Sequence, residues 1–368
     1  MRRATLIGAL AVALAARAEA QPRWRLVEEL RIGGADSGAA SLNDVRDIAL
    51  GARGQIYVFD YQAQEIRLFD AGGKFVRLVG RKGAGPGEFT QPNGIRTAPD
   101  GSLWVNDHSN ARFTVFTADG AFLKQVRVPP WGWGYRWDGV IDAQGRVLET
   151  VPRHAAGNAP GTTVVRRFDP ATAKFDTLEI PPCLPGVDEG SQWTFSWRTA
   201  RGGGGMQVPL APIRVSRIDP SGAWWCGLGS DYHIKLMTLG AGETLAEIHG
   251  KAPVVQVPSR VRDSVIADLE KRTSAYPSGT VDASRVPRRY PRISEINVDD
   301  KGRLWVRRRG PTGLALDVWS RNGVQLATLD APVMFGKYLP FLVRDEKLYA
   351  VVPDEDGVPF VVRYGIVR

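Results

Sequence analysis

Two stretches of the chain repeat one another. Residues 54–75 are GQIYVFDYQAQEIRLFDAGGKF, and residues 101–122 are GSLWVNDHSNARFTVFTADGAF. A fixed offset held over several residue types is the signature of a repeat architecture, in which each copy is one supersecondary unit. The positions that keep one offset of 47 residues are Gly54 and Gly101, Asp60 and Asp107, Phe69 and Phe116, Gly73 and Gly120, and Phe75 and Phe122.

Each copy predicts four short strands joined by tight turns. In the second copy we expect strands at 94–97, 102–106, 112–116 and 122–126, because apolar residues alternate there between Gly- and Asp-containing turns. A four-stranded antiparallel unit of roughly 45 residues is typical of a propeller blade.

The later copies are degenerate but keep the order of turn, glycine and apolar strand. Gly145, Gly222 and Gly302 mark blades three to five, and residues 341–364 supply three strands of a sixth. Residues 25–32, RLVEELRI, provide the missing strand, and closing the ring removes exposed strand edges. The predicted fold class is therefore all-β: a six-bladed β-propeller of four-stranded antiparallel blades, closed by the N-terminal strand, with one inserted helix.

That helix is predicted over Ser259–Ala275. Ser259 is the expected N-cap, Pro277 follows the end, and apolar residues recur at helical spacing. The apolar stripe consists of Val261, Val265, Ile266 and Leu269. We expect the helix to pack on the ring; a lid or a partner-docking helix is the alternative. The run Gly202–Gly205 lacks the Lys-Ser/Thr of a phosphate-binding loop and is predicted to be a flexible loop.

The first twenty residues resemble a secretory signal peptide. Arg2 and Arg3 precede the apolar stretch 4–16, and Ala18-Glu19-Ala20 fits a cleavage site before Gln21. About thirteen apolar residues are too few to span a bilayer. We therefore expect cleavage near Ala20/Gln21 and an exported, monomeric domain over 21–368, periplasmic or extracellular and not membrane-spanning.

The composition agrees with a globular exported protein. The chain has a formal charge of +9, 43% hydrophobic residues and 11 Trp, which is enough for a core. Because no Lys/Arg block resembles a nucleic-acid arm, we expect no nucleic-acid partner. The two cysteines, Cys183 and Cys226, leave two interpretations open, a disulfide or buried thiols.

A family resemblance rests on residues 80–122, GRKGAGPGEFTQPNGIRTAPDGSLWVNDHSNARFTVFTADGAF. This stretch resembles the NHL-type repeat of bacterial six-bladed propellers, over roughly Asn43–Val128. The strand-ending Asp of the first two copies is replaced later by Val151, Leu228 and Arg308. The amidating lyases among these propellers have histidines where this chain has Gln64 and Ala111, so the resemblance does not imply that activity.

The expected binding surface is the face that carries the second-to-third loops and the blade connections, here called the long-loop face. Its long segments include 181–211 and 251–291, whereas the turns on the opposite face are short. Arginine and aromatic side chains there suit anionic ligands, glycans or peptides. The candidate ligand-binding residues are Asp60, Asp107, His108, Trp131, Trp133, Arg153, His154, Arg307 and Arg308.

Catalytic and metal-binding interpretations have weaker support in the sequence. There is no G-x-S-x-G elbow, so we predict no catalytic residues and no resident cofactor. His108, His154 and His233 lie on one face but at different repeat positions, which disfavours a shared metal. We expect a non-enzymatic propeller that binds a ligand or protein partner. The alternative is a lactonase-like hydrolase or lyase with calcium or zinc in the channel near Asp60, Asp107 or His108.

Overall fold

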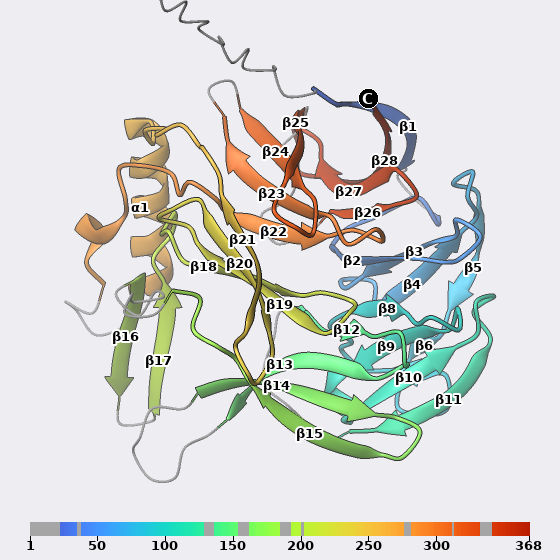
Figure 1. Ribbon diagram of the computed structural model, residues 1–368. Helices are drawn as coiled ribbons and strands as arrows, with labels where there is room; N and C mark the ends of the chain where they lie inside the picture. The colour runs from blue at the N-terminus through green and yellow to red at the C-terminus, as the bar shows by residue number, and fades with distance from the viewer. Residues whose placement is uncertain are drawn as a thin grey trace, which may run out of the picture.

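The computed structural model describes residues 23–34, 38–128, 136–153, 162–184, 193–199, 202–275, 281–310, 313–331 and 341–368. Six four-stranded antiparallel sheets form a ring, with one helix at its side (Figure 1). The predicted six-bladed propeller is confirmed. The proposed signal peptide lies outside the described residues and stays a prediction.

The blades follow the predicted order along the chain. Blades one to three comprise β2 (Val45–Leu50), β3 (Ile56–Asp60), β4 (Glu65–Phe69), β5 (Phe75–Val79); β8 (Ile95–Thr97), β9 (Leu103–Asp107), β10 (Arg112–Phe116), β11 (Phe122–Arg127); and β12 (Val140–Ile141), β13 (Val147–Arg153), β14 (Thr162–Asp169), β15 (Lys174–Glu179). Blades four to six comprise β18 (Arg214–Ile218), β19 (Ala223–Leu228), β20 (His233–Thr238), β21 (Thr244–His249); β22 (Glu295–Val298), β23 (Leu304–Arg309), β24 (Leu314–Trp319), β25 (Gln325–Ala331); and β26 (Leu342–Arg344), β27 (Lys347–Pro353), β28 (Pro359–Val367), β1 (Arg25–Gly33).

The N-terminal strand closes the ring, as predicted. Strand β1 is antiparallel to β28, with Arg25 opposite Val367 and Gly33 opposite Phe360. The first and last described strands therefore lie side by side (Figure 1). Because β1 completes blade six, the C-terminal strand is left with no unpaired edge.

The core consists of apolar clusters between neighbouring blades. Tyr57 and Phe59 of blade one pack with Leu103 and Val105 of blade two, and all four are fully buried. Five further clusters join the other pairs of neighbouring blades, including blade six with blade one. Because both faces of a blade are covered, its inner strands are almost continuously apolar.

The two insertions pack against each other beside the ring. Helix α1 (Ser259–Thr273) buries Leu269 against Phe195 of β16 (Thr194–Thr199). The run Gly202–Gly205, predicted to be a flexible loop, belongs instead to strand β17 (Gly202–Gln207), which pairs with β16. A side chain at Gly204 would come within 2.7 Å of the Trp197 indole, so glycine there makes room for the ring.

The predicted helix cap is wrong. Pro258, with φ −55° and ψ 140°, occupies the N-cap position, and no side chain accepts a hydrogen bond there. The serine at 259 is the first helical residue because proline fixes the extended conformation that precedes it. Among the residues that the structure describes, no helix has the length and hydropathy needed to cross a membrane.

Cys183 and Cys226 form a disulfide, which decides between the two interpretations that the sequence left open. Their Cα atoms lie 5.6 Å apart, and the bond joins the segment after blade three to β19 in blade four. Both residues are buried in the cluster between these blades.

We predict that the disulfide contributes about 4 kcal/mol to the free energy of unfolding, because it closes a loop with a sequence separation of 43 residues. The double variant Cys183→Ser/Cys226→Ser should unfold at a lower urea concentration than the oxidised wild type. Reductant should shift the wild type to the same midpoint. A midpoint that is insensitive to reductant would contradict the prediction.

A second prediction concerns Glu346, in the turn between β26 and β27. Burial favours its neutral form, but Lys301, Arg303 and Arg368 outweigh that effect and lower the pKa of Glu346 to about 2. The stabilisation is therefore present above the usual value of 4.5 and is lost as the pH falls toward 2.

Glu346→Gln should lower the free energy of unfolding by about 1 kcal/mol at pH 7. Urea denaturation at several pH values should show the difference from wild type shrinking below pH 4.5. A difference that stays constant down to pH 3 would show that Glu346 acts through something other than its charge.

Candidate functional site

The first strands of the blades surround the ring axis. Neighbouring first strands contact one another, β2 with β8, β8 with β12, and β18 with β22. Charged side chains gather on these strands and on the segments next to them. They are the arginines Arg96, Arg136, Arg217 and Arg307 and the carboxylates Asp47, Asp138 and Glu295. We call this set the channel cluster.

One ion pair of the channel cluster joins blades one, two and three. Asp47 accepts hydrogen bonds from Arg96 Nη1 (2.5 Å) and from the backbone N–H of Ile95 (3.0 Å). The other Arg96 nitrogens donate to the carbonyl oxygens of Gly139 (2.8 Å) and Trp137 (2.7 Å). Arg96 is thus fully engaged in holding blades together.

Two other arginines of the channel cluster have few partners. Arg136 Nε lies 3.6 Å from Asp47 Oδ1, within ion-pair range but too far for a hydrogen bond, and this buried nitrogen has no hydrogen-bond partner among the described residues. The side chain of Arg217 makes no hydrogen bond or ion pair with any described residue, and its Nε is also buried. Burial, aided by repulsion from Arg96 and Arg217, lowers the pKa of Arg136 to about 10, against the opposing effect of Asp47.

Burial likewise lowers the pKa of Arg217, with Glu295 opposing that effect and Arg96 reinforcing it. Arg96 thus lowers the pKa of both Arg136 and Arg217, as expected for cations in one part of the molecule. Both under-partnered arginines still carry their proton at neutral pH, because a guanidinium does not titrate in that range.

The predicted residues Arg307 and Arg308 differ in their surroundings. Arg307 Nη2 lies 2.8 Å from Glu295, while its buried Nε has no partner. Arg308 instead donates two hydrogen bonds to Asp317, at 2.6 and 2.9 Å. Asp317 also accepts from Tyr232, so Arg308 belongs to a buried structural network.

Asp60 and Asp107 hold the blade connections in place. Each is fully buried and accepts a hydrogen bond from a backbone N–H seventeen residues earlier, Asn43 for Asp60 (2.9 Å) and Thr90 for Asp107 (2.8 Å). Asp107 also accepts from Arg112 Nε (3.1 Å). Burial raises the pKa of Asp107, and these donors oppose the rise.

The remaining candidates are spread around the long-loop face. His108 begins a 3-10 turn after β9, and Arg153 ends β13, where it pairs with Glu179 across exposed surface (2.5 Å). Trp131, Trp133 and His154 lie outside the described residues. The structure therefore brings Arg307 into the channel cluster but leaves the other described candidates spread over blades one, two, three and five.

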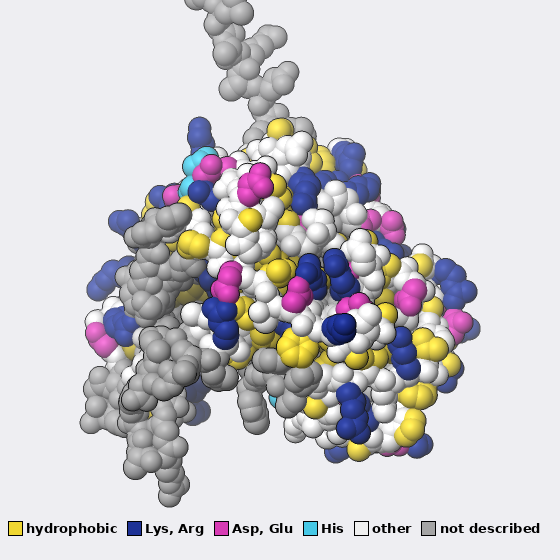
Figure 2. Space-filling view, turned by 60° about the horizontal axis from the view of Figure 1, so that its bottom comes forward, with side chains coloured by type: hydrophobic (Ala, Val, Ile, Leu, Met, Phe, Trp, Pro, Cys, Tyr) yellow, Lys and Arg dark blue, Asp and Glu magenta, His cyan; other side chains and the backbone are white. Residues whose placement is uncertain are grey.

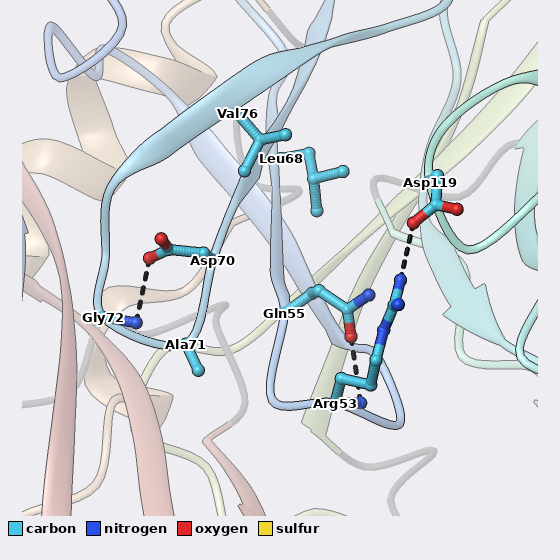
Figure 3. Close-up of a pocket in the computed structure, with 8 residues that line it drawn as sticks. All are labelled: Arg53, Gln55, Leu68, Asp70, Ala71, Gly72, Val76 and Asp119. Carbon is cyan, nitrogen blue, oxygen red and sulfur yellow. Dashed lines mark hydrogen bonds and ion pairs between the residues drawn. The ribbon is translucent and has the colours of Figure 1, made fainter.

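A cavity of about 440 Å³ lies on the opposite, short-turn face. It is formed by turns of blades one and two, and its polar groups bond to one another (Figure 3). Arg53 donates to Asp119 at 2.6 Å, and Asp70 accepts from the backbone N–H of Gly72 at 2.9 Å. On the surface in view in Figure 2, basic and acidic side chains are interspersed.

The sequence contains a signal for the channel cluster that the analysis above missed. Arg96 and Arg217 each lie five residues before a turn glycine, Gly101 and Gly222. When the copies are aligned on the turn glycine, two of them therefore have an arginine at the same position of the first strand, where apolar residues are usual. Three carboxylates share a second such position, seven residues before a turn glycine: Asp47, Asp138 and Glu295.

Comparisons with known proteins support the fold. A family model described as a 6-bladed beta-propeller matches residues 41–131. The chain is similar to a member of the DUF4221 family from Bacteroides vulgatus, with a TM-score of 0.57 and 13% identity over 94% of this chain and 99% of that one. It is also similar to a candidate exported protein from Bacteroides fragilis, with a TM-score of 0.50 and 15% identity over 94% and 96% of the two chains.

A third similar structure is a catalytically inactive virginiamycin B lyase from Staphylococcus aureus, with a TM-score of 0.46 and 14% identity over 92% and 99% of the two chains. A comparison with curated proteins finds no match. At these identities the likeness shows the six-bladed fold alone. The resemblance to NHL repeats stays a prediction.

We predict that Asp107→Ala lowers the free energy of unfolding by about 3 kcal/mol. The variant leaves the largely buried Arg112 without its counter-charge and removes the acceptor of the Thr90 N–H. Urea denaturation measures this effect. Asp119→Ala is the matched control: its pair with Arg53 is 2.6 Å long but both side chains are more than two-thirds exposed, so a loss below about 1 kcal/mol is expected. Equal losses in the two variants would refute the structural role of Asp107.

Proposed function

We propose that this chain is an exported, non-enzymatic propeller that binds an anionic ligand at the channel cluster. The ligand is a carboxylate or similar anion of a small molecule, an acidic glycan or a peptide. The observation that carries the proposal is that two arginines of the channel cluster, Arg136 and Arg217, have buried Nε atoms without a hydrogen-bond partner among the described residues.

The charge of the cluster supports an anion. Four guanidinium groups face three carboxylates, and two of these carboxylates, Asp47 and Glu295, are already paired with Arg96 and Arg307. A partly buried cation without a hydrogen-bonded counter-charge costs free energy. An anion that accepted charge-assisted hydrogen bonds from Arg136 and Arg217 would remove that cost.

The position of the cluster supports access from the long-loop face. Strand β22 begins at Glu295 on that face, and Arg307 lies opposite Glu295 near the end of β23. The side chains of Arg136 and Arg96 keep 17% and 19% of their surface exposed, so solvent reaches the cluster.

The chemistry of the cluster favours binding over catalysis. Arginine cannot act as a general base or nucleophile near neutral pH. Asp60 and Asp107, which a lactonase-like reaction would need, lie in different blades and accept hydrogen bonds from their own blade connections. Export is supported by the disulfide, which persists in oxidising compartments, and by the likeness to a candidate exported protein.

A matched pair of variants tests the proposal. Arg217→Met removes a charge without a described partner, so the variant should be as stable as wild type or more stable by about 1 kcal/mol. Arg96→Met breaks a fully bonded group and should cost about 3 kcal/mol. Urea denaturation gives both values.

Binding is measured by titration calorimetry of the wild type with succinate, citrate, phosphate and oligogalacturonate. Arg217→Met should bind the preferred anion at least tenfold more weakly than wild type. Arg53→Ala, on the short-turn face, is the control and should bind it like wild type. A stable Arg217→Met variant that binds every anion as wild type does would overturn the assignment. So would a wild type that binds none of the four.

A further inference from the structure

A second site lies on the outer strands of blade four. In the antiparallel pair β20–β21, His233 lies opposite His249 and Lys235 lies opposite Glu247. Because side chains alternate along a strand, these four residues share one face of the blade. Ile234 and Ile248, the residues between them, point to the other face and are fully buried.

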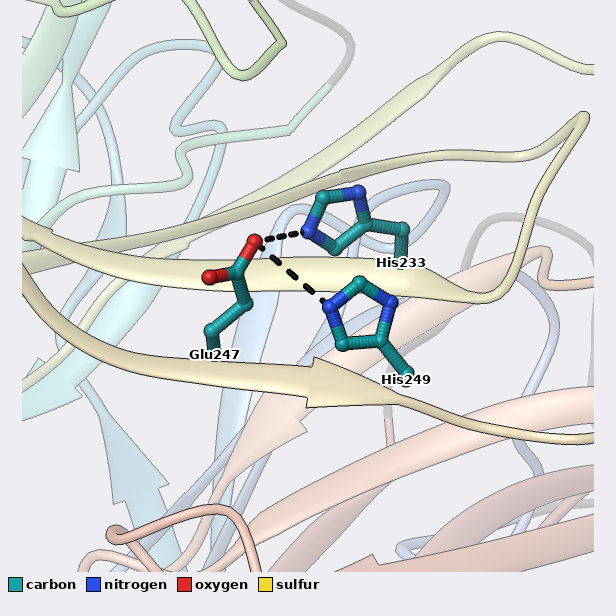
Figure 4. Close-up of side chains that lie close together, drawn as sticks. All are labelled: His233, Glu247 and His249. Carbon is teal, nitrogen blue, oxygen red and sulfur yellow. Dashed lines mark hydrogen bonds and ion pairs between the residues drawn. The ribbon is translucent and has the colours of Figure 1, made fainter.

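Three of these side chains converge. His233 Nε2 is hydrogen-bonded to Glu247 Oε1, and His249 Nε2 lies 3.6 Å from the same oxygen (Figure 4). The two imidazole rings are stacked, with centroids 4.2 Å apart and planes inclined by 23°. One nitrogen from each histidine and one carboxylate oxygen all lie within 4.8 Å of one another.

Such a set matches the ligands of a transition metal. Zinc is bound at about 2.0–2.1 Å by imidazole nitrogen and carboxylate oxygen, so ligand atoms around a tetrahedral ion are about 3.3 Å apart. Small side-chain rotations bring the three atoms to that spacing, because Glu247 is 40% and His249 70% exposed. Among the described residues, this is the cluster of His, Cys, Asp and Glu side chains close enough to share an ion.

We propose that His233, Glu247 and His249 form a binding site for a divalent transition-metal ion of the zinc type. The ligand atoms are Nε2 of each histidine and a carboxylate oxygen of Glu247. With three protein ligands the fourth position is open to water or to a donor group of another molecule. The site lies where β21 ends and β20 begins, at the outer rim of the long-loop face, and it is separate from the channel cluster.

Lys235 limits the affinity of this site. Its ammonium group lies 3.6 Å from Glu247 Oε1 and competes with a cation for that oxygen. Replacing the lysine with a neutral side chain removes the repulsion and leaves all three ligands in place. The site therefore predicts opposite effects for replacing the ligand His249 and for replacing Lys235.

The experiment is titration calorimetry of the untagged, chelator-treated full chain with Zn²⁺ and, separately, Ni²⁺. We expect one ion per chain in the wild type. His249→Ala should weaken binding at least tenfold, and Lys235→Gln should tighten it severalfold. His108→Ala, on blade two, is the control and should bind like wild type. Near-ultraviolet circular dichroism verifies that each variant is folded.

Spectroscopy of the Cu²⁺-loaded protein gives a second readout. Two equatorial imidazole nitrogens should appear in the paramagnetic resonance spectrum of the wild type, and one in that of His249→Ala. The proposal is overturned if the wild type binds none of the three ions, or if His249→Ala binds zinc as tightly as wild type. An unchanged or weaker affinity in Lys235→Gln would also contradict the assigned ligand set.

Discussion

The packing of each blade against two neighbours is the constraint on which the rest of this structure depends. An inner strand such as β3 is buried along its whole length, so no blade can cover its apolar surface alone. Six interblade clusters satisfy this requirement only if the ring closes, and closure is supplied by β1 beside β28. Strand β1 is itself mostly exposed, but it covers the outer edge of β28 and adds Ile32 to the cluster between blades six and one.

Closure has a consequence at the axis. The first strands of neighbouring blades contact one another there, so a polar side chain on one of them either pairs with a group of the next blade or has no partner. Asp47 and Arg96 pair, and Gly94 permits it: a Cβ at that position would lie 3.0 Å from an Asp47 carboxylate oxygen and 2.8 Å from the Trp137 side chain. The Arg217 side chain has no such partner among the described residues, and an unpaired guanidinium weakens the fold, which is why the proposed anion site is centred on it.

The sequence predicts the ring because turn glycines and alternating strands are local signals, repeated from Gly54 to Gly302. It predicts the closing strand because residues 341–364 supply only three of the four strands that a blade needs. It misses the strand at Gly202–Gly205, whose conformation depends on pairing with β16 and on the Trp197 ring. It identifies Arg307 but not Arg136 or Arg217, because partnership is a property of neighbouring blades and not of residue type.

The two faces of the ring differ in how many of their polar side chains are used to bond the backbone. On the short-turn face the same bonding recurs: Asp142, Asp219 and Asp299 each accept backbone N–H groups two and four residues later. The oxygens of these carboxylates are used as hydrogen-bond acceptors within the turn. On the long-loop face, Asp60 and Asp107 hold their blade connections in a similar way, but the later connections differ in length and have Val151, Leu228 and Arg308 at that position. Side chains there can be placed by the strands without being needed to close a turn, and both the channel cluster and the histidine pair of blade four are placed in this way.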